Sequence, residues 1–336
     1  MKASVVLPVF NKAPFLKECL DSVLAQSFSA FELIAVDDAS TDGSLELLRS
    51  IDDPRLRIIA LDKNVGPGGA AQRGIDAGSG EYIIRVDADD VMLPGRFAKQ
   101  VAMLDRDPSI GACSGHLRLL ADRTVLRRLD LADDDCKARM LFSVPLHQAS
   151  AAYRRSVLVK NDIRYHDHWP HYGEDWMHQV ALSRVTRFKN VDEAMVLYRT
   201  GPSSTSQGRD RAADLRVLYR YVFKELGIPL TEEELDLQLY ALKCFARPVD
   251  RESVVDFKRW LDRIALLDQQ LHVFSKPALQ RQLVRVWDEF FYHLPSIGLS
   301  AAWAHLRAGR SFHPSKLYYL LAMMVNGTSN VKSKAQ

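Results

Sequence analysis

Short apolar runs alternate with helix-patterned segments over the first 115 residues. The runs have the β-branched and aromatic character of buried strands, and they cover residues 3–10, 31–36, 56–61, 81–86 and 110–115. Apolar residues recur at helical spacing over residues 14–26, 45–51, 66–78 and 94–104. Strands that alternate with helices form parallel sheets through right-handed crossovers. We therefore expect an α/β fold with a mostly parallel sheet sandwiched by helices.

The pattern loosens between residues 120 and 200. It predicts short helices at 137–142 and 154–160, a helix over 174–184 and a strand within 188–198. Between them, residues 164–175 are loop-like and rich in histidine and aromatic side chains.

The character of the chain changes after the Gly-Pro-Ser-rich stretch at 201–208. Four helices are predicted from there on, at 210–226, 251–272, 277–293 and 315–324. Thr231 and Glu234 match a capping box ahead of a further short helix. We place a domain boundary near residue 205, with the α/β domain at 1–205 and an all-helical C-terminal extension at 206–336.

Composition narrows the classes of protein to consider. Of the 336 residues 47% are hydrophobic, enough for a sizeable core, and the net charge of +3 demands no nucleic-acid partner. The four cysteines form no C-x-x-C pair, so neither a zinc ribbon nor a disulfide framework is expected. That usage suits a reducing compartment. No leader and no apolar run of bilayer length is present, and we expect a cytoplasmic protein.

Acidic residues follow the fourth predicted strand. Asp87, Asp89 and Asp90 stand where this strand ends, and Glu81 and Arg85 are expected to face solvent along it. Ligands of α/β sheets bind at the carboxyl ends of strands, and oxygen ligands suit a hard divalent cation. An exposed acidic turn is the alternative for this motif taken alone.

Two further motifs lie at strand ends. Asp37 and Asp38 follow the second strand, where a carboxylate accepts hydrogen bonds from a base or a ribose, or caps the next helix. Gly66 begins a Gly-Pro-Gly-Gly run after the third strand. Its spacing is not G-x-G-x-x-G, so we expect no dinucleotide site, although glycine permits close backbone approach to a ligand.

Several ordered segments together resemble a family-two glycosyltransferase of the GT-A fold. They read VVLPVFNK, VDDASTDGS, NVG, GIDAGSGEY and DADDVMLP over residues 1 to about 100, and the resemblance returns at GED (173–175) and YR (198–199). It does not extend over the helical part. It implies a GT-A type Rossmann-like sheet and an enzyme of bacterial surface-glycan synthesis.

The resemblance also implies a role for individual residues. The nucleotide-binding residues would be Pro8, Val9, Phe10, Asp38, Gly66 and Asp87. Asp89, with Asp87, would bind Mn²⁺ or Mg²⁺. Asp175 would be the general base that deprotonates an acceptor hydroxyl. The residues expected at the acceptor are Glu174, Trp169, Tyr172 and His147. Enclosure by aromatic side chains would raise the pKa of Asp175, whereas its place at a helix start would lower it.

Two positions depart from the family pattern. Ala70-Ala71-Gln72 stands where A-R-N is usual, although Arg73 is adjacent. Gly201 stands near the place of a histidine that touches metal or phosphates, and His147 is a candidate substitute. The histidines at 166, 168, 171 and 178 lack an H-E-x-x-H or cysteine partner, so we interpret them as part of a polar acceptor-binding loop and not as a zinc site.

The expected function is inverting, metal-assisted transfer of a sugar from a nucleoside diphosphate, with UDP favoured, to a hydroxyl of a glycan or lipid-linked acceptor. One alternative is a non-catalytic GT-A-fold protein that binds nucleotide or carbohydrate. Another is a sugar nucleotidyltransferase, which needs a basic triphosphate loop that is not found near the first strand.

The apolar run at 316–324 has two interpretations. Lys316 precedes it, and Lys332 and Lys334 follow it, so it suits peripheral contact of the C-terminal helices with the inner membrane face. Burial as a last core helix is the simpler interpretation. The sequence predicts no oligomeric state.

Overall fold

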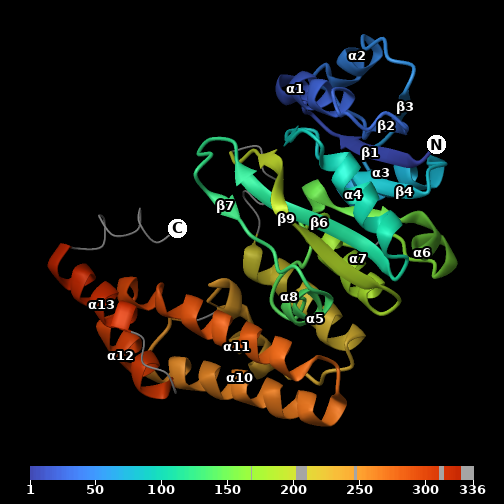
Figure 1. Cartoon of the computed structure of the whole chain (residues 1–336). Coiled ribbons are helices and arrows are strands. Elements are labelled where there is room, and N and C mark those ends of the chain that lie inside the picture. The colour runs from blue at the N-terminus through green and yellow to red at the C-terminus, as the bar shows by residue number, and fades with distance from the viewer. Residues whose placement is uncertain (168, 202–209, 246–247, 310–313, 327–336) are drawn as a thin grey trace. The chain divides into compact units, whose positions relative to one another are not determined.

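The computed structural model describes residues 1–167, 169–201, 210–245, 248–309 and 314–326, which belong to two units (Figure 1). The first unit comprises Met1–Lys137 with Val144–Gly208, and the second Ala138–Ser143 with Arg209–Gln336. The predicted boundary at residue 205 stays a prediction, because residues 202–209 lie outside the described residues.

One mixed sheet forms the centre of the first unit. Its nine strands, counted over the described residues, are β1 (Ala3–Val9), β2 (Phe31–Asp37), β3 (Leu56–Ala60), β4 (Tyr82–Arg85), β5 (Val91–Met92), β6 (Ile110–Leu119), β7 (Leu126–Arg127), β8 (Ala152–Arg154) and β9 (Arg187–Tyr198). Their order is β3-β2-β1-β4-β8-β6-β9-β5, with β7 paired to β6. The four predicted strands from residue 3 to residue 86 are confirmed as a parallel array.

Strand direction explains why distant segments meet at one edge of the sheet. The short strand β8 is antiparallel to both β4 and β6, and β9 is parallel to β6. Hence β4, β6 and β9 all run the same way. The residues that follow β2, β4 and β9, namely Asp38, Asp87 and Arg199, therefore emerge along the same edge.

Helices cover both faces of the parallel strands. In the first unit they are α1 (Ala13–Leu24), α2 (Ser44–Arg49), α3 (Gly66–Ala77), α4 (Arg96–Arg106), α6 (Arg155–Lys160) and α7 (Glu174–Ser183), with a 3₁₀ turn η1 (Gln148–Ser150). Leu33 and Ala35 of β2 join one core cluster with α1, α2 and α4. Ile34 and Val36 of the same strand pack against α3. Side chains of a strand alternate between faces, so this apolar run packs against helices on both sides.

Helix α5 (Asp133–Arg139) begins earlier than the predicted helix at 137–142. Three aspartates, 133 to 135, occupy its first turn, where negative charge stabilises a helix. The apolar periodicity alone does not reveal this acidic start.

The second unit is helical, as predicted. It contains α8 (Arg211–Glu225), α9 (Glu232–Gln238), η2 (Leu239–Leu242), α10 (Arg251–Leu271), α11 (Lys276–Phe291), η3 (Leu294–Ser296), α12 (Leu299–Ala308) and α13 (Pro314–Asn326). The capping box of Thr231 and Glu234 is confirmed. Helix α12 was not predicted, because its alanine-rich sequence has little amphipathic pattern. No helix in the described part of the chain is both long and apolar enough to cross a bilayer.

A buried arginine fixes the end of β4. The guanidinium of Arg96 donates from Nη2 to the carbonyl of Arg85 at 2.6 Å and from Nε to Oε1 of Gln100 at 3.0 Å. Burial lowers the pKa of Arg96 to about 9. These hydrogen bonds hold the strand where it leads into the acidic motif.

We predict that Gly80→Ala destabilises the first unit by about 1–3 kcal/mol. A methyl group at Gly80 would lie 2.5 Å from the backbone of β1, at the carbonyl carbon of Ala3 and the nitrogen of Ser4, so the backbone itself must move. Urea denaturation measures the effect. Gly201→Ala is the matched control, because nothing lies within 4 Å of its added methyl. Equal stability of the two variants would contradict the close approach.

Candidate functional site

The acidic motif forms a turn directly after β4. Within it the N–H of Asp90 donates to the carbonyl of Asp87 at 3.1 Å. Asp90 is buried, whereas the side chains of Asp87 and Asp89 stay 35% and 20% exposed. The exposed pair, not Asp90, is thus available to a ligand.

Each acidic residue of the turn has a basic neighbour. Nζ of Lys12 lies 2.5 Å from Oδ2 of Asp89, and Nη2 of Arg85 lies 3.3 Å from Oδ1 of Asp87. The backbone N–H of Arg199 donates to Oδ1 of Asp90 at 2.8 Å. The site therefore holds fixed positive charges beside its carboxylates.

Arg199 also clamps the turn from the end of β9. Its Nε donates to the carbonyl of Asp89 at 2.8 Å, and its Nη2 to Oε2 of Glu18 at 2.6 Å. Its guanidinium lies 4.5 Å from the ring centroid of Phe15. The Tyr198-Arg199 motif is thus part of the site.

Arg85 does not face solvent, and this expectation was wrong. Its side chain is only 3% exposed, and Nη1 donates to the carbonyls of Val6 and Val86. Alternate residues of a strand point the same way, so Arg85 points to the side of Asp87. The spacing of Arg85 and Asp87, two positions apart at the end of an apolar strand, was the sequence signal for this ion pair.

Asp38 is buried and holds the start of α3. Its two carboxylate oxygens accept from the N–H groups of Val65 at 2.7 Å and Gly66 at 2.9 Å. Burial raises the pKa of Asp38, although these two hydrogen bonds lower it in part. Each oxygen keeps a further lone pair for another donor.

Gly66 is covered by a histidine. It has φ of +81°, and a methyl group there would lie 2.6 Å from the ring of His171. The group that approaches the backbone of Gly66 closely is therefore the imidazole of His171. The electrostatic interaction with His171 also lowers the pKa of Asp38.

The segment before α7 brings Glu174 and Asp175 to the same site. A methyl group at Gly68 would lie 2.9 Å from Cγ of Glu174, so α7 begins against the start of α3. The negative charge of Asp87 raises the pKa of Asp175, so the two carboxyls lie close enough to interact. The predicted base and the predicted metal ligands therefore share one site.

Both carboxyls at the start of α7 are less acidic than usual. Burial raises the pKa of Asp175 to about 6, and the charge of Asp87 adds to this. The N–H of Trp176, which donates to Oδ1 at 2.8 Å, acts in the opposite direction. Burial raises the pKa of Glu174 to about 8, with a contribution from Asp175. Of the two opposing effects expected at Asp175, burial prevails, and the charge of Arg85 lowers the pKa of both residues in part.

The residues expected under the nucleotide differ in accessibility. Val9 is fully buried in the core and meets the site only through its carbonyl, which accepts from the N–H of Asp38 at 2.8 Å. Pro8 is half-buried. The ring of Phe10 is 45% exposed, so it alone of the three offers a free aromatic face.

The residues expected at the acceptor lie around the same segment. Trp169 is buried and packs edge-on to Tyr165 and His166, with centroid distances of 6.5 and 4.8 Å. Tyr172 is half-buried. His147, also half-buried, precedes η1, and its carbonyl accepts from the hydroxyl of Ser114 at 3.2 Å. Their roles stay predictions.

The histidines do not form a metal cluster among the described residues, where no three His, Cys, Asp or Glu side chains are grouped for an ion. His178 is buried and stacks on Tyr165 at 4.3 Å. Burial lowers the pKa of His178 to about 3, so it is neutral and part of the core, not of the loop. His168 lies outside the described residues.

Arg73 and Gly201 lie at or beside the two positions where the chain departs from the family pattern. Nη1 of Arg73 lies 3.3 Å from both the carbonyl of Gly69 and Oδ1 of Asp167. Gly201 is exposed. Lys12 is thus the cation that lies nearest to the exposed carboxylate of Asp89.

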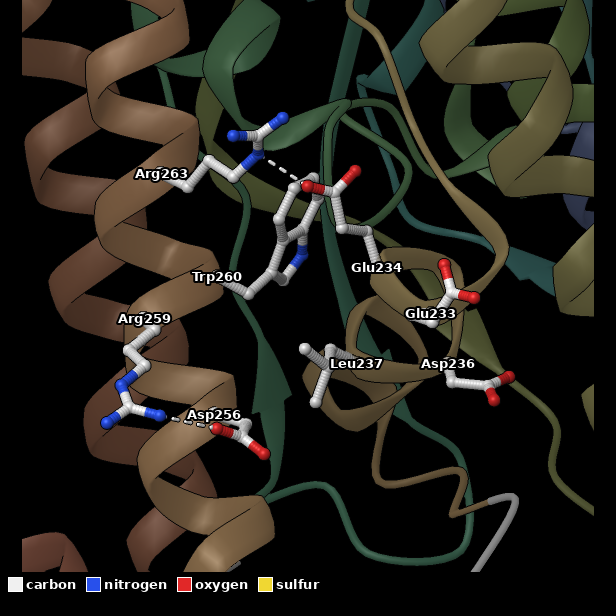
Figure 2. Close-up of a pocket in the computed structure, with 8 residues that line it drawn as sticks. All are labelled: Glu233, Glu234, Asp236, Leu237, Asp256, Arg259, Trp260 and Arg263. Carbon is white, nitrogen blue, oxygen red and sulfur yellow. Dashed lines mark hydrogen bonds and ion pairs between the residues drawn. The ribbon is translucent and has the colours of Figure 1, made fainter.

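A cavity of about 320 Å³ lies in the second unit (Figure 2). It is lined by Glu233, Glu234, Asp236, Leu237, Asp256, Arg259, Trp260 and Arg263. Arg263 pairs with Glu234 at 2.5 Å, and Arg259 with Asp256 at 3.0 Å. None of the site residues predicted from the sequence lines this cavity.

Comparisons with known proteins agree with the geometry. Residues 4–159 match the family model described as Glycosyl transferase family 2. The chain is 26% identical to the succinoglycan biosynthesis protein ExoO of Rhizobium meliloti over 327 residues, which cover 92% of this chain and 88% of that protein.

Two solved structures have a similar fold. S. aureus TarS 1-349 in complex with UDP-GlcNAc superposes with a TM-score of 0.61 and 21% identity, covering 86% of this chain and 91% of the TarS 1-349 chain. The mannosyltransferase PcManGT from Pyrobaculum calidifontis, in complex with GDP-Man and Mn²⁺, has a TM-score of 0.50 and 19% identity, covering 96% and 86%.

We predict that Glu174→Gln flattens the pH dependence of stability. A carboxyl with a raised folded pKa stabilises the fold fully below its unfolded pKa, and this stability is lost as pH rises through the folded value. For Glu174 the loss runs from about pH 4.5 to about pH 8. Between pH 4.5 and 8.5 the parent should lose on the order of 2 kcal/mol more than the variant.

Thermal unfolding followed by circular dichroism at several pH values measures this difference. Glu46→Gln is the control, because Glu46 is exposed on α2. If Glu174→Gln followed the parent curve, Glu174 would not be a half-buried, protonated carboxyl at neutral pH.

Proposed function

Because the chain belongs to glycosyltransferase family 2, we propose that it moves a sugar from a nucleoside diphosphate, with UDP as the carrier, to a hydroxyl of a glycan or glycolipid. One observation carries the proposal. Partly exposed carboxylates flanked by cations at Asp87 and Asp89 lie in the same site as a carboxyl of raised pKa at Asp175. A glycosyl transfer needs charge stabilisation on the leaving group and a base on the acceptor.

Asp175 is the base in this proposal. With a pKa of about 6 it is largely ionised at neutral pH, yet it holds a proton better than an ordinary aspartate. It takes the proton of the acceptor hydroxyl, whose oxygen bonds to the anomeric carbon. The bond from that carbon to the diphosphate oxygen breaks, and the nucleoside diphosphate leaves. A single displacement of this kind inverts the configuration at the anomeric carbon.

Glu174 has a different part. With a pKa of about 8 it carries a proton at neutral pH and donates a hydrogen bond to an acceptor hydroxyl. The two adjacent carboxyls are thereby separated into a proton acceptor and a hydrogen-bond donor. Tyr172, Trp169 and His147 are the further acceptor residues in this proposal.

The nucleotide lies over the ends of β1 and β2. The exposed ring of Phe10 packs against the base, and Asp38 accepts from it with the lone pairs that Val65 and Gly66 leave free. Pro8 and the backbone of Val9 line the floor, and Asp87 meets the ribose. The structures of TarS with UDP-GlcNAc and with UDP support UDP as the carrier.

The donor set at the turn fits a divalent metal. Asp87 and Asp89 offer oxygens, which Mn²⁺ and Mg²⁺ prefer, and the ammonium of Lys12 already stands as a cation beside Asp89. Two carboxylates are an incomplete set, so a bound metal would need further ligands besides Asp87 and Asp89. A bound metal supplies positive charge that stabilises the diphosphate as it leaves. Mn²⁺ in the PcManGT complex supports this assignment.

The acceptor is a growing surface polysaccharide or glycolipid in this proposal. ExoO, which aligns over most of this chain, is named for succinoglycan biosynthesis. All assigned residues lie in the α/β domain at 1–205, and none lies in the helical extension at 206–336.

We predict that Asp175→Asn keeps donor affinity and loses turnover. Asparagine has the same shape and cannot take a proton, so the rate should fall by about 10²–10⁴ while the Kd for UDP-sugar stays within about twofold. Release of UDP measures turnover, and calorimetry measures binding. Asp162→Asn, in an exposed loop with φ of +49°, is the control, since asparagine tolerates that conformation.

An Asp175→Asn variant with parental turnover would place the base elsewhere. A parent protein that binds UDP-sugars tightly but transfers none to any acceptor or to water would be a non-catalytic member of the family.

We predict that Lys12 and a metal compete for Asp89. Lys12→Ala should tighten Mn²⁺ binding several-fold, because the ion no longer displaces an ammonium 2.5 Å from Oδ2. Asp89→Asn should weaken it by at least about tenfold. Titration of the free Mn²⁺ signal by electron paramagnetic resonance measures both. Lys17→Ala, which removes an exposed ammonium paired with Asp21 on the same helix, is the control. Unchanged Mn²⁺ affinity in Asp89→Asn would remove Asp89 from the metal.

A further inference from the structure

The last two described helices expose large apolar side chains. On α12, Leu299 and Trp303 are 45% and 44% exposed, and Arg307, four residues further, is exposed as well. On α13, Tyr318 and Leu321 are 76% and 51% exposed. Residues three or four apart share one face of a helix, so each helix has an exposed apolar stripe. We name these residues the α12–α13 surface.

The opposite faces of both helices are held inside the second unit. His305 of α12 is buried, stacks on Trp287 with a centroid distance of 3.8 Å, and lies 2.7 Å from its carbonyl. Lys316 of α13 is buried beside Asp288 and Phe291. These contacts determine which faces point outward, so rotation of either helix cannot bury its stripe. The sequence allowed either core burial or surface contact for this segment, and α13 has both a buried and an exposed face.

The sequence at this end of the chain carries basic residues only, although one of them, Lys316, is paired with Asp288. Residues 290–336 contain five Lys and Arg and no Asp or Glu, whereas the whole chain has 45 basic and 42 acidic residues and a net charge of only +3. The rest of the chain is therefore net acidic. A second copy that packed its own α12–α13 surface here would bring like charges together, and a neutral partner would gain nothing from this concentration.

We infer that the α12–α13 surface binds the headgroup region of an anionic lipid bilayer. Tryptophan and tyrosine prefer the interface between water and lipid, where their rings are in an apolar layer and their polar atoms remain wet. Leucines add apolar area, and basic side chains are attracted to anionic headgroups. Helix α13 has 13 residues, too few to span a bilayer, so it lies in the interface. The inference does not depend on the transferase reaction.

Flotation of the full chain with vesicles tests the proposal. The protein should float with vesicles of phosphatidylcholine and phosphatidylglycerol at 70:30 and stay in solution with phosphatidylcholine alone. Trp303→Ser and Tyr318→Ser should each reduce the partition coefficient by at least about tenfold. Arg307→Glu should reduce binding to the anionic vesicles, and high salt should have the same effect.

Leu266→Ser is the matched control, since Leu266 is 60% exposed on α10 of the same unit. It should float like the parent, and circular dichroism should show that every variant keeps its melting temperature. Equal flotation of Trp303→Ser and Leu266→Ser would overturn the proposal. So would absence of binding to the anionic vesicles. A lipid-free dimer that Trp303→Ser dissociates in sedimentation velocity would assign the surface to a second copy instead.

Release of UDP without vesicles separates this inference from the proposed reaction. Trp303→Ser should keep parental turnover with a soluble acceptor while it loses flotation. A parent that floats but transfers no sugar would leave the membrane surface in place and remove the reaction.

Discussion

The buried guanidinium of Arg85 is the charge on which the site depends. It stands two residues before Asp87 on β4, and the carbonyls of Val6 and Val86 replace part of its hydration. Several carboxyls with restricted access to water meet at this edge of the sheet, and they repel one another. A cation built into the strand offsets that repulsion at Asp87, Glu174 and Asp175 together. Neutral replacement would leave these groups without the balancing charge, which is costly in a poorly solvated place.

Around this cation the carboxyls divide into two kinds. Asp87 and Asp89 stay partly open to water and next to basic side chains, which suits the binding of cations. Glu174 and Asp175 stand at the first turn of α7, where the helix dipole favours their ionised forms, yet burial prevails and raises both pKa values. The carboxyl groups of the site therefore behave in two ways, as cation binders or as groups that hold a proton. Solvent access, and not residue type, decides which of the two applies.

Periodicity along the chain predicted the elements whose pattern or contacts involve residues close in the sequence. The strand at 31–36 alternates between two cores, and the capping box at Thr231 and Glu234 is formed within one turn, so both are visible in sequence. What escaped prediction depends on distant partners. Arg85 resembles a solvent-facing residue until Asp87, Glu174 and Asp175 are placed around it. The three residues of β8 are too few to show a period, and their antiparallel direction is decided by β4 and β6.

The segment between β8 and β9 leaves the sheet after Arg154 and returns at Arg187, and both strands are tied into the sheet by their neighbours. It carries Glu174 and Asp175, whereas the acidic turn is carried by β4. Segments that connect strands tolerate change far better than the strands themselves. Under the proposed function, substitutions within residues 155–186 would change the acceptor side of the site while the acidic turn after β4 is kept. Because Asp175 lies in the same stretch as the exposed loop residues, the proposed base and a variable acceptor surface would be carried by one connecting segment and not by the strands.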